Sequence, residues 1–117
     1  MIEIFLTNKT KLIKNRYFIK FIEEVKDEII VFIDKKKKIR VFSSICPHFG
    51  GEIYFDYKND FLRCKWHDWK FSKENGVCTS FPIKGKLKNY DFNLRPNNLK
   101  EFKFKIKNDN IYLVFNE

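Results

Sequence analysis

The chain has 117 residues, which fits one ordinary domain spanning residues 1–117 with its own buried core. Apolar residues make up 44% of it and aromatic residues 18%, which excludes a disordered chain. The formal net charge of +9 comes from lysines and arginines scattered along the whole chain, so the charge by itself identifies no partner; we expect no nucleic-acid partner.

Three features of the sequence bear on its location. No stretch approaches the roughly eighteen apolar residues that a membrane span needs, and Met1–Leu6 lacks the basic start and long apolar run of a secretion signal. Three cysteines allow at most one disulfide, which is unlike a small secreted domain held by disulfides. We therefore expect a cytoplasmic protein without a membrane partner.

Short apolar and aromatic runs separated by turn-like residues predict a mainly β architecture. In chain order, the expected strands are Ile2–Leu6, Tyr17–Ile22, Ile29–Ile33, Ile39–Phe42, Phe61–Cys64, Phe102–Ile106 and Ile111–Phe115. No helix longer than about ten residues is predicted, and the ambiguous stretch Phe18–Val25 is assigned to a strand.

The residues between these strands predict turns and loops. Lys35–Lys38 falls between two expected strands, where a solvated hairpin turn is a simpler interpretation than an anion site. The last two strands form a hairpin through 107–110, with lysines on its solvent face. The stretch Arg95–Asn98 is expected to be a loop rather than a domain boundary.

The chemistry-bearing residues are concentrated in two short clusters. The chain holds three cysteines and two histidines, and four of these five lie in Cys46-Pro47-His48 and Cys64-Lys65-Trp66-His67. Each cluster opens with a cysteine and closes with a histidine, which predicts two matched loops. Gly50 and Gly51 follow the first cluster, where the backbone must turn tightly.

Several kinds of site could use such a set. A [2Fe–2S] cluster with two thiolates on one iron and two imidazoles on the other would use all four residues. A structural zinc site could also take them, although zinc ligands usually come as Cys-x₂₋₄-Cys and His-x₃₋₅-His pairs. Four unrelated core residues would not explain why Cys and His occur in duplicate at loop positions flanked by Gly and Pro. A Cys/His nucleophile would leave the second pair unexplained. Cys78 has no partner in the pattern and is interpreted as a small core residue.

The residues around both clusters resemble the Rieske family. Cys46-Pro47-His48-Phe49-Gly50-Gly51 is similar to its first loop, and the stretch from Cys64 to Phe71, followed by Gly76-Val77-Cys78 and Pro82, is similar to its second. The resemblance extends over Ile29–Pro82 and is greatest to Rieske ferredoxins and to the Rieske domains of aromatic-ring oxygenases. Asp68 departs from it, because the family usually places glycine there.

The resemblance implies an all-β, Rieske-like antiparallel sandwich of two to three sheets, with cluster-binding loops 46–51 and 64–69 at one tip. It implies one [2Fe–2S] cluster per chain, in which Cys46 and Cys64 hold one iron while His48 and His67 hold the other. Trp66 and Trp69 would cover this cluster, and the imidazoles would lie near the surface. No catalytic residue is expected.

Two functions are compatible with such a cluster. One is a soluble, low-potential ferredoxin that carries single electrons from a flavin reductase to a terminal oxygenase. The other is a separately encoded electron-transfer subunit of a larger Rieske oxygenase. With both histidines committed to the cluster, no 2-His-1-carboxylate iron site can be built from this chain, so a complete oxygenase is not expected.

The expectation of a low potential rests on residues that differ from the respiratory Rieske proteins. Those members carry a second cysteine pair between the loops, and serine and tyrosine hydroxyls that donate to the cluster sulfurs. Here Gly51 and Trp66 stand in place of the cysteines, and Trp69 and Phe71 in place of the hydroxyls. A carboxylate at Asp68 would lower the potential further.

Overall fold

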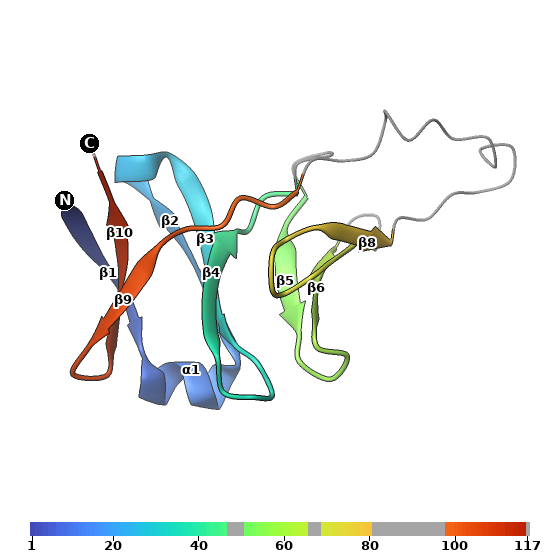
Figure 1. Ribbon diagram of the computed structural model, residues 1–117, viewed down its shortest axis with the longest axis horizontal. Coiled ribbons are helices and arrows are strands. Elements are labelled where there is room, and N and C mark those ends of the chain that lie inside the picture. The colour runs from blue at the N-terminus through green and yellow to red at the C-terminus, as the bar shows by residue number, and fades with distance from the viewer. Residues whose placement is uncertain (47–50, 66–68, 81–97, 117) are drawn as a thin grey trace, which may run out of the picture.

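The computed structural model describes residues 1–46, 51–65, 69–80 and 98–116 (Figure 1). These residues form three antiparallel sheets, which confirms the all-β prediction. The strands are β1 (Ile2–Asn8), β2 (Tyr17–Ile22), β3 (Asp27–Ile33), β4 (Ile39–Ser43), β5 (Ile53–Asp56), β6 (Phe61–Cys64), β7 (Lys70–Phe71), β8 (Cys78–Ser80), β9 (Phe104–Lys107) and β10 (Asn110–Phe115).

The sheet β2-β3-β4 is the middle layer of the molecule. Side chains alternate between the two faces of a strand, and both faces of this sheet are apolar. Phe32 and Phe42 belong to one buried core, whereas Val31 and Val41 belong to another. Because β3 contributes to both cores, its residues Ile29–Ile33 are all buried.

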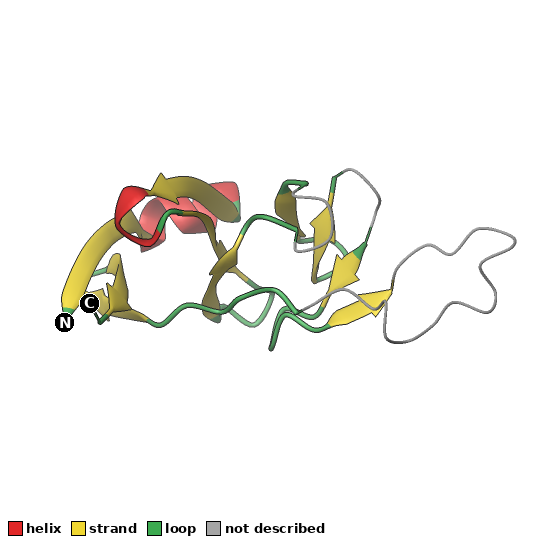
Figure 2. Ribbon diagram, turned by 90° about the horizontal axis from the view of Figure 1, so that it is seen from above, coloured by secondary structure: helices red, strands yellow, loops and turns green. Residues whose placement is uncertain are grey.

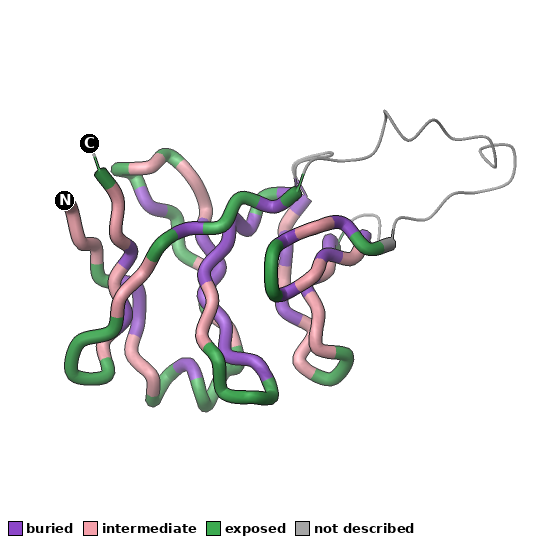
Figure 3. The backbone as a smooth tube through the Cα atoms, viewed as in Figure 1, coloured by how far each residue is buried: buried purple, intermediate pink, exposed green. Residues whose placement is uncertain are grey.

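Each face of the middle sheet is covered by a second sheet. The sheet β1-β10-β9 and the helix α1 (Lys9–Asn15) lie on one side, and we call this part, together with β2-β3-β4, the large lobe (Figure 1). The sheet β5-β6-β7-β8 lies on the other side and is called the small lobe. The core between the two lobes, the inter-lobe core, contains Phe32 stacked on Phe55 with ring centroids 4.4 Å apart. Figure 3 shows buried residues following the strands on both sides of this contact.

The chain ends meet at the outer sheet of the large lobe. Strand β1 pairs with β10, so that Ile2 lies opposite Phe115 (Figure 1). The β9–β10 hairpin turns through Asn108 and Asp109, both at positive φ, as the sequence predicts. Lys105 and Lys107 of this hairpin form ion pairs with Glu3 on the outer face, which confirms the predicted lysine-bearing surface.

The β3–β4 turn is organised by one buried carboxylate. Asp34 Oδ1 accepts hydrogen bonds from the backbone N–H groups of Lys36 and Lys38, both at 2.9 Å. Asp34 itself is buried, while the four lysines that follow it are exposed. The predicted solvated hairpin turn at Lys35–Lys38 is therefore confirmed.

Several elements differ from the sequence-based expectations. Helix α1 was not predicted; it is only seven residues long, buries only Leu12, and begins where Asn8 Oδ1 accepts a hydrogen bond from the Lys11 N–H. The stretch assigned to a strand over Phe18–Val25 stays extended only to Ile22 and ends in a 3₁₀ turn, Glu23–Val25. Both helical segments belong to the large lobe (Figure 2).

The remaining differences lie in the small lobe and around it. Strands β5, β7 and β8 were not predicted, because they are two to four residues long and carry little periodic signal. Residues 95–97 of the expected loop lie outside the described residues. Within the described part of the chain, no helix is long and apolar enough to span a membrane.

The turn between β7 and β8 depends on one glycine, which gives a first prediction. Gly76 has a φ of 74°, and a Cβ there would lie 2.7 Å from the Leu99 carbonyl oxygen and 3.0 Å from Phe42 Cε1. Gly76→Ala should lower the free energy of unfolding by about 2 kcal/mol in urea denaturation, because it adds left-handed strain and a backbone clash.

The control is Glu74→Ala, at an exposed position of the same turn. Its effect should stay within about 0.5 kcal/mol. Equal effects of the two substitutions would contradict the close packing of Gly76 against Leu99.

Candidate metal centre

Two of the four candidate ligands lie on either side of one extended segment. The backbone of Gly51–Ile53 runs between the segment Ser44–Cys46 on one side and the residues Cys64 and Lys65 on the other. On one side the N–H of Ile53 donates to the Ser44 carbonyl at 2.7 Å, and Ile45 is paired with Glu52. On the other side Ile53 is paired with Cys64 in the β5–β6 ladder. The two cysteine-bearing segments are thus neighbours of the same strand.

This register directs both cysteine side chains to the same face. Ile45 and Lys65 are each level with Glu52, and side chains one residue farther along a strand point to the opposite face. Glu52 and Lys65 form an ion pair of 2.6 Å on the outer face. Cys46 and Cys64 therefore face inward, and both are almost fully buried in the inter-lobe core.

The two loops that follow the cysteines close in the same way. The N–H of Cys46 donates to the Gly51 carbonyl at 2.8 Å, and the N–H of Cys64 donates to the Trp69 carbonyl at 2.8 Å. In each case the cysteine amide bonds the carbonyl five residues ahead, so each loop spans six residues. These are residues 46–51 and 64–69, the ranges of the two cluster loops expected from the sequence.

The chain entering the first loop is anchored to the large lobe by two serines. Ser43 Oγ donates to Asp27 Oδ1 at 3.0 Å, and Ser44 Oγ donates to Glu28 Oε1 at 2.9 Å. Ser44 is fully buried, and its N–H donates to the Glu28 carbonyl at 2.7 Å. Sequence reasoning missed this anchor, although two adjacent serines at the end of an apolar strand mark where the strand leaves its sheet.

His48 and His67 lie outside the described residues, as do Trp66 and Asp68. The structure consequently brings together the two cysteines and leaves the two imidazoles, their exposure and the effect of Asp68 as expectations. Within the described ranges, no three His, Cys, Asp or Glu side chains are grouped as a metal site.

The third cysteine lies in the same core. Cys78 is buried on β8, where it pairs with Phe71, which in turn pairs with Leu62. Leu62 and Cys64 are two residues apart and share a face of β6. The interpretation of Cys78 as a small core residue agrees with its burial among apolar side chains.

The surroundings of the cysteines are apolar. Trp69, Phe71 and Leu99 are buried in the same core as Cys46 and Cys64. Two cysteines on matched loops, held by backbone hydrogen bonds and shielded from water, are a suitable thiolate pair for an iron of an iron–sulfur cluster. The described residues therefore fit the thiolate half of such a site.

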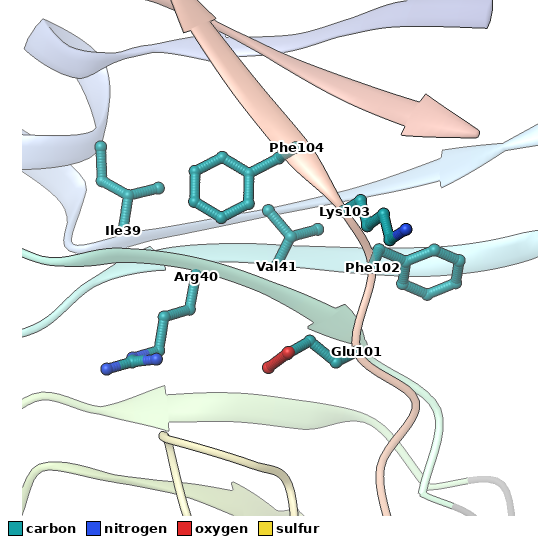
Figure 4. Close-up of a pocket in the computed structure, with 7 residues that line it drawn as sticks. All are labelled: Ile39, Arg40, Val41, Glu101, Phe102, Lys103 and Phe104. Carbon is teal, nitrogen blue, oxygen red and sulfur yellow. The ribbon is translucent and has the colours of Figure 1, made fainter. Parts of the chain in front are cut away.

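A separate cavity of about 510 Å³ lies where the chain leading into β9 diverges from β4, and Figure 4 shows its lining. Ile39, Val41 and Phe104 lie on one side of β4, whereas Arg40 and Glu101 lie on the other (Figure 4). None of the candidate ligands lines this cavity, so it is not part of the metal centre.

This chain is similar to a known domain family and to parts of several known proteins. A family model described as the Rieske [2Fe-2S] domain matches residues 4–91. A cholesterol 7-desaturase of Ciona intestinalis is 31% identical over 71 residues, which cover 59% of this chain and 15% of that protein. The oxygenase subunit of a 3-chlorobenzoate-3,4-dioxygenase of Comamonas testosteroni is 33% identical over 57 residues, covering 48% and 13%. The chain thus corresponds to only a small part of these relatives.

Solved structures share the fold at low sequence identity. The ferredoxin of carbazole 1,9a-dioxygenase from Nocardioides aromaticivorans has a TM-score of 0.72 and 14% identity, and the match covers 97% of both chains. Naphthalene 1,2-dioxygenase has a TM-score of 0.72 and 24% identity, covering 98% of this chain and 26% of that one. A plasma membrane Rieske protein of Synechocystis has a TM-score of 0.71 and 14% identity, covering 96% and 99%.

The serine anchor gives a second prediction. Ser44→Ala removes the hydroxyl that donates to Glu28 in a buried position, so it should lower the free energy of unfolding by about 1.5 kcal/mol in urea denaturation. Ser72→Ala is the matched control, because Ser72 Oγ donates to Glu74 Oε2 at 2.8 Å in an exposed turn. Its cost should stay below about 0.5 kcal/mol. If the two substitutions cost the same, Ser44 is not an anchor of the first loop.

Proposed function

This chain belongs to the Rieske [2Fe-2S] domain family, and we propose that it is a low-potential Rieske ferredoxin that carries single electrons from a flavin reductase to a terminal oxygenase. Family membership makes it a cluster-binding electron-transfer domain with redox protein partners. Beyond family membership, we propose that the cluster has a low reduction potential and that electrons pass from the reductase to the oxygenase. We also propose that residues 1–117 form a single domain and that the protein is cytoplasmic. The observation that carries the ferredoxin proposal is the presence of Trp69 and Phe71, neither of which has a hydroxyl group, in the buried core that holds the two cysteines.

We assign one iron to Cys46 and Cys64 and the other to His48 and His67. When bound, the [2Fe–2S] cluster takes up and releases one electron at a time. What supports the thiolate pair is its geometry: both cysteines face one core from loops closed by equivalent 2.8 Å hydrogen bonds. Trp69 and Phe71 exclude water from the thiolates, which keeps the ligands from competing reactions.

The low potential is inferred from two positions near the thiolates at which a hydroxyl donor is missing. Hydrogen bonds to sulfur stabilise the reduced, more negative state of a cluster and so raise its potential. Trp69 and Phe71, which stand where respiratory members carry hydroxyls, are both buried and have none. The hydroxyls of Ser43 and Ser44, at the entry to the first loop, are already donated to Asp27 and Glu28.

A second candidate function is an electron-transfer subunit or domain of a Rieske oxygenase. It is favoured by the relatives, since the oxygenase subunit and the desaturase match this chain over 13–15% of their length. The ferredoxin is supported by the fold, because a solved ferredoxin matches 97% of this chain with a TM-score of 0.72. Affinity purification from the native host discriminates them: a stoichiometric, salt-resistant oxygenase partner would indicate a subunit, and weak, salt-sensitive capture a ferredoxin.

The ligand assignment gives a third prediction. The purified protein should contain two irons and two acid-labile sulfides per chain, and Cys46→Ala, Cys64→Ala, His48→Ala or His67→Ala should each abolish them. Cys78→Ala is the matched control and should retain the full iron content. The measurement is elemental analysis with a sulfide assay on anaerobically prepared protein. Stoichiometric zinc without sulfide would contradict the cluster, and iron loss in Cys78→Ala equal to that in Cys64→Ala would contradict the ligand set.

The potential gives a fourth prediction. Protein-film voltammetry at neutral pH should place the midpoint near the low end of the Rieske range, at about −150 mV. Phe71→Tyr restores a hydroxyl at a buried position and should raise the midpoint, whereas Phe61→Tyr, on the outer face of the small lobe, should leave it unchanged. A wild-type midpoint above about +100 mV would overturn the ferredoxin proposal in favour of a respiratory role.

A further inference from the structure

In the described part of the chain, the backbone passes between the two lobes at one end. The chain leaves the large lobe after Ser44, enters the small lobe at Ile53, and is again bonded to the large lobe at Lys100, whose carbonyl accepts from the Ser43 N–H (Figure 1). This end also carries the cysteine loops. The opposite end of the interface is formed by two turns, 34–38 of the large lobe and 57–60 of the small lobe, which are not consecutive in the chain.

A buried lysine joins these two turns. Lys73, from the turn after β7, places its Nζ 2.6 Å from Asp60 Oδ2 and 3.2 Å from Asp34 Oδ2. The side chain of Lys73 is only 8% exposed and that of Asp34 only 1%, whereas Asp60 is 31% exposed. Lysine is seldom buried unless it is paired, and this one is paired with a carboxylate from each lobe.

The pKa values of Lys73 and Asp34 are both shifted by this contact. Burial lowers the pKa of Lys73, but the hydrogen bonds and charges of Asp60 and Asp34 outweigh it and hold that pKa above its ordinary value. Burial likewise raises the pKa of Asp34, but donation from the Lys38 N–H and from Lys73 outweighs it, and the net pKa is lowered. Lys73 and Asp34 are therefore both charged at neutral pH.

Neighbouring contacts reinforce the same end of the interface. Lys35 Nζ donates to the Lys58 carbonyl at 2.8 Å, and the Arg16 guanidinium carbon lies 4.0 Å from the centroid of the Tyr57 ring. Both of these contacts also cross from the large lobe to the small lobe. They are exposed or partly exposed, however, and exposed ion contacts contribute little. The triad of Lys73, Asp34 and Asp60 is different, because Lys73 and Asp34 are buried and water cannot replace either charge.

We propose that Lys73 is a positioning residue: with Asp34 and Asp60 it forms a latch that keeps the small lobe seated on the large lobe and so keeps the inter-lobe core closed over the two cysteines. The first loop leaves from β4 of the large lobe, while the second leaves from β6 of the small lobe. Backbone pairing to Gly51–Ile53 sets their register, and the seating of the lobes determines how tightly the core packs around their cysteines.

The latch follows from the described side chains alone, and only its effect on the cluster rests on the proposed ligands. Without Lys73, two carboxylates would face each other across the interface with no cation between them. Their repulsion would open the lobes at the latch end, with the backbone connections at the loop end acting as the hinge. Cys78, buried in the inter-lobe core and outside the proposed ligand set, reports such opening.

The experiment measures alkylation of Cys78 by iodoacetamide in the cluster-containing protein, read by peptide mass spectrometry at neutral pH without denaturant. Lys73→Met should speed alkylation at least tenfold, and Lys73→Arg, which keeps the charge, should restore most of the protection. Lys107→Met is the matched control, because Lys107 pairs with Glu3 within the large lobe at 2.8 Å. It should leave the rate unchanged.

A second control separates latching from general stability. Leu12→Ala creates a cavity in the large-lobe core, away from the interface, and lowers global stability without touching the latch. At equal free energy of unfolding, Lys73→Met should expose Cys78 faster than Leu12→Ala does. Equal rates in the two variants would overturn the latch and leave the triad as an ordinary contribution to stability.

Two further outcomes are distinguishable. If Lys73→Met does not fold, the same assay is done with Asp60→Asn, which removes only the partly exposed carboxylate. This variant should accelerate alkylation of Cys78 less than tenfold. An unchanged alkylation rate would overturn the proposal. Release of iron to a chelator should accelerate in parallel with alkylation. Faster alkylation with unchanged iron release would retain the latch but show that the ligand loops do not depend on it, and so would count against the positioning role.

Discussion

The double burial of strand β3 is the constraint on which the rest of the molecule depends. Five consecutive residues, Ile29–Ile33, lose contact with water because each face of the strand is covered by a different sheet. A central strand buried on both faces cannot shift by one residue without exchanging the side chains of two cores. The positions of β4, which ends at Ser43, and of Ser44 after it are fixed by the same register. The segment that leads to Cys46 is therefore positioned by a strand whose last five residues are all buried.

The sequence predicted most of this framework because the framework strands carry a strong apolar signal. Tyr17–Ile22 and Phe61–Cys64 have the same bounds in the structure as in the prediction, and the expected antiparallel sheets are present. The cysteine loops were found for another reason, since Cys and His recurring at short spacing have a chemical meaning that apolar residues lack. Placement of His48, His67 and Asp68 remains a prediction.

The elements that the sequence did not predict depend on a few individual residues and their contacts rather than on a repeated apolar pattern. Helix α1 is short and rich in lysine, and only Leu12 is buried, so the sequence shows no apolar helical periodicity there. Its start depends on one asparagine cap. Strands β7 and β8 are set by Gly76, whose need for a positive φ and for close packing on Leu99 cannot be read from the residue alone. Lys73, Asp34 and Asp60 each look like surface residues in the sequence, and only the packing of the two lobes brings them together and buries Lys73 and Asp34.

The pairing of Ile2 with Phe115 has a consequence for how such a domain can be used in larger proteins. Both ends of the fold leave from adjacent strands of the outer sheet, on the lobe that does not carry the second cysteine loop (Figure 1). A polypeptide attached at either end, or at both, would extend away from the redox centre and leave its surface open. Evolution could thus join this unit to unrelated catalytic modules, or release it from them, without redesigning the metal site.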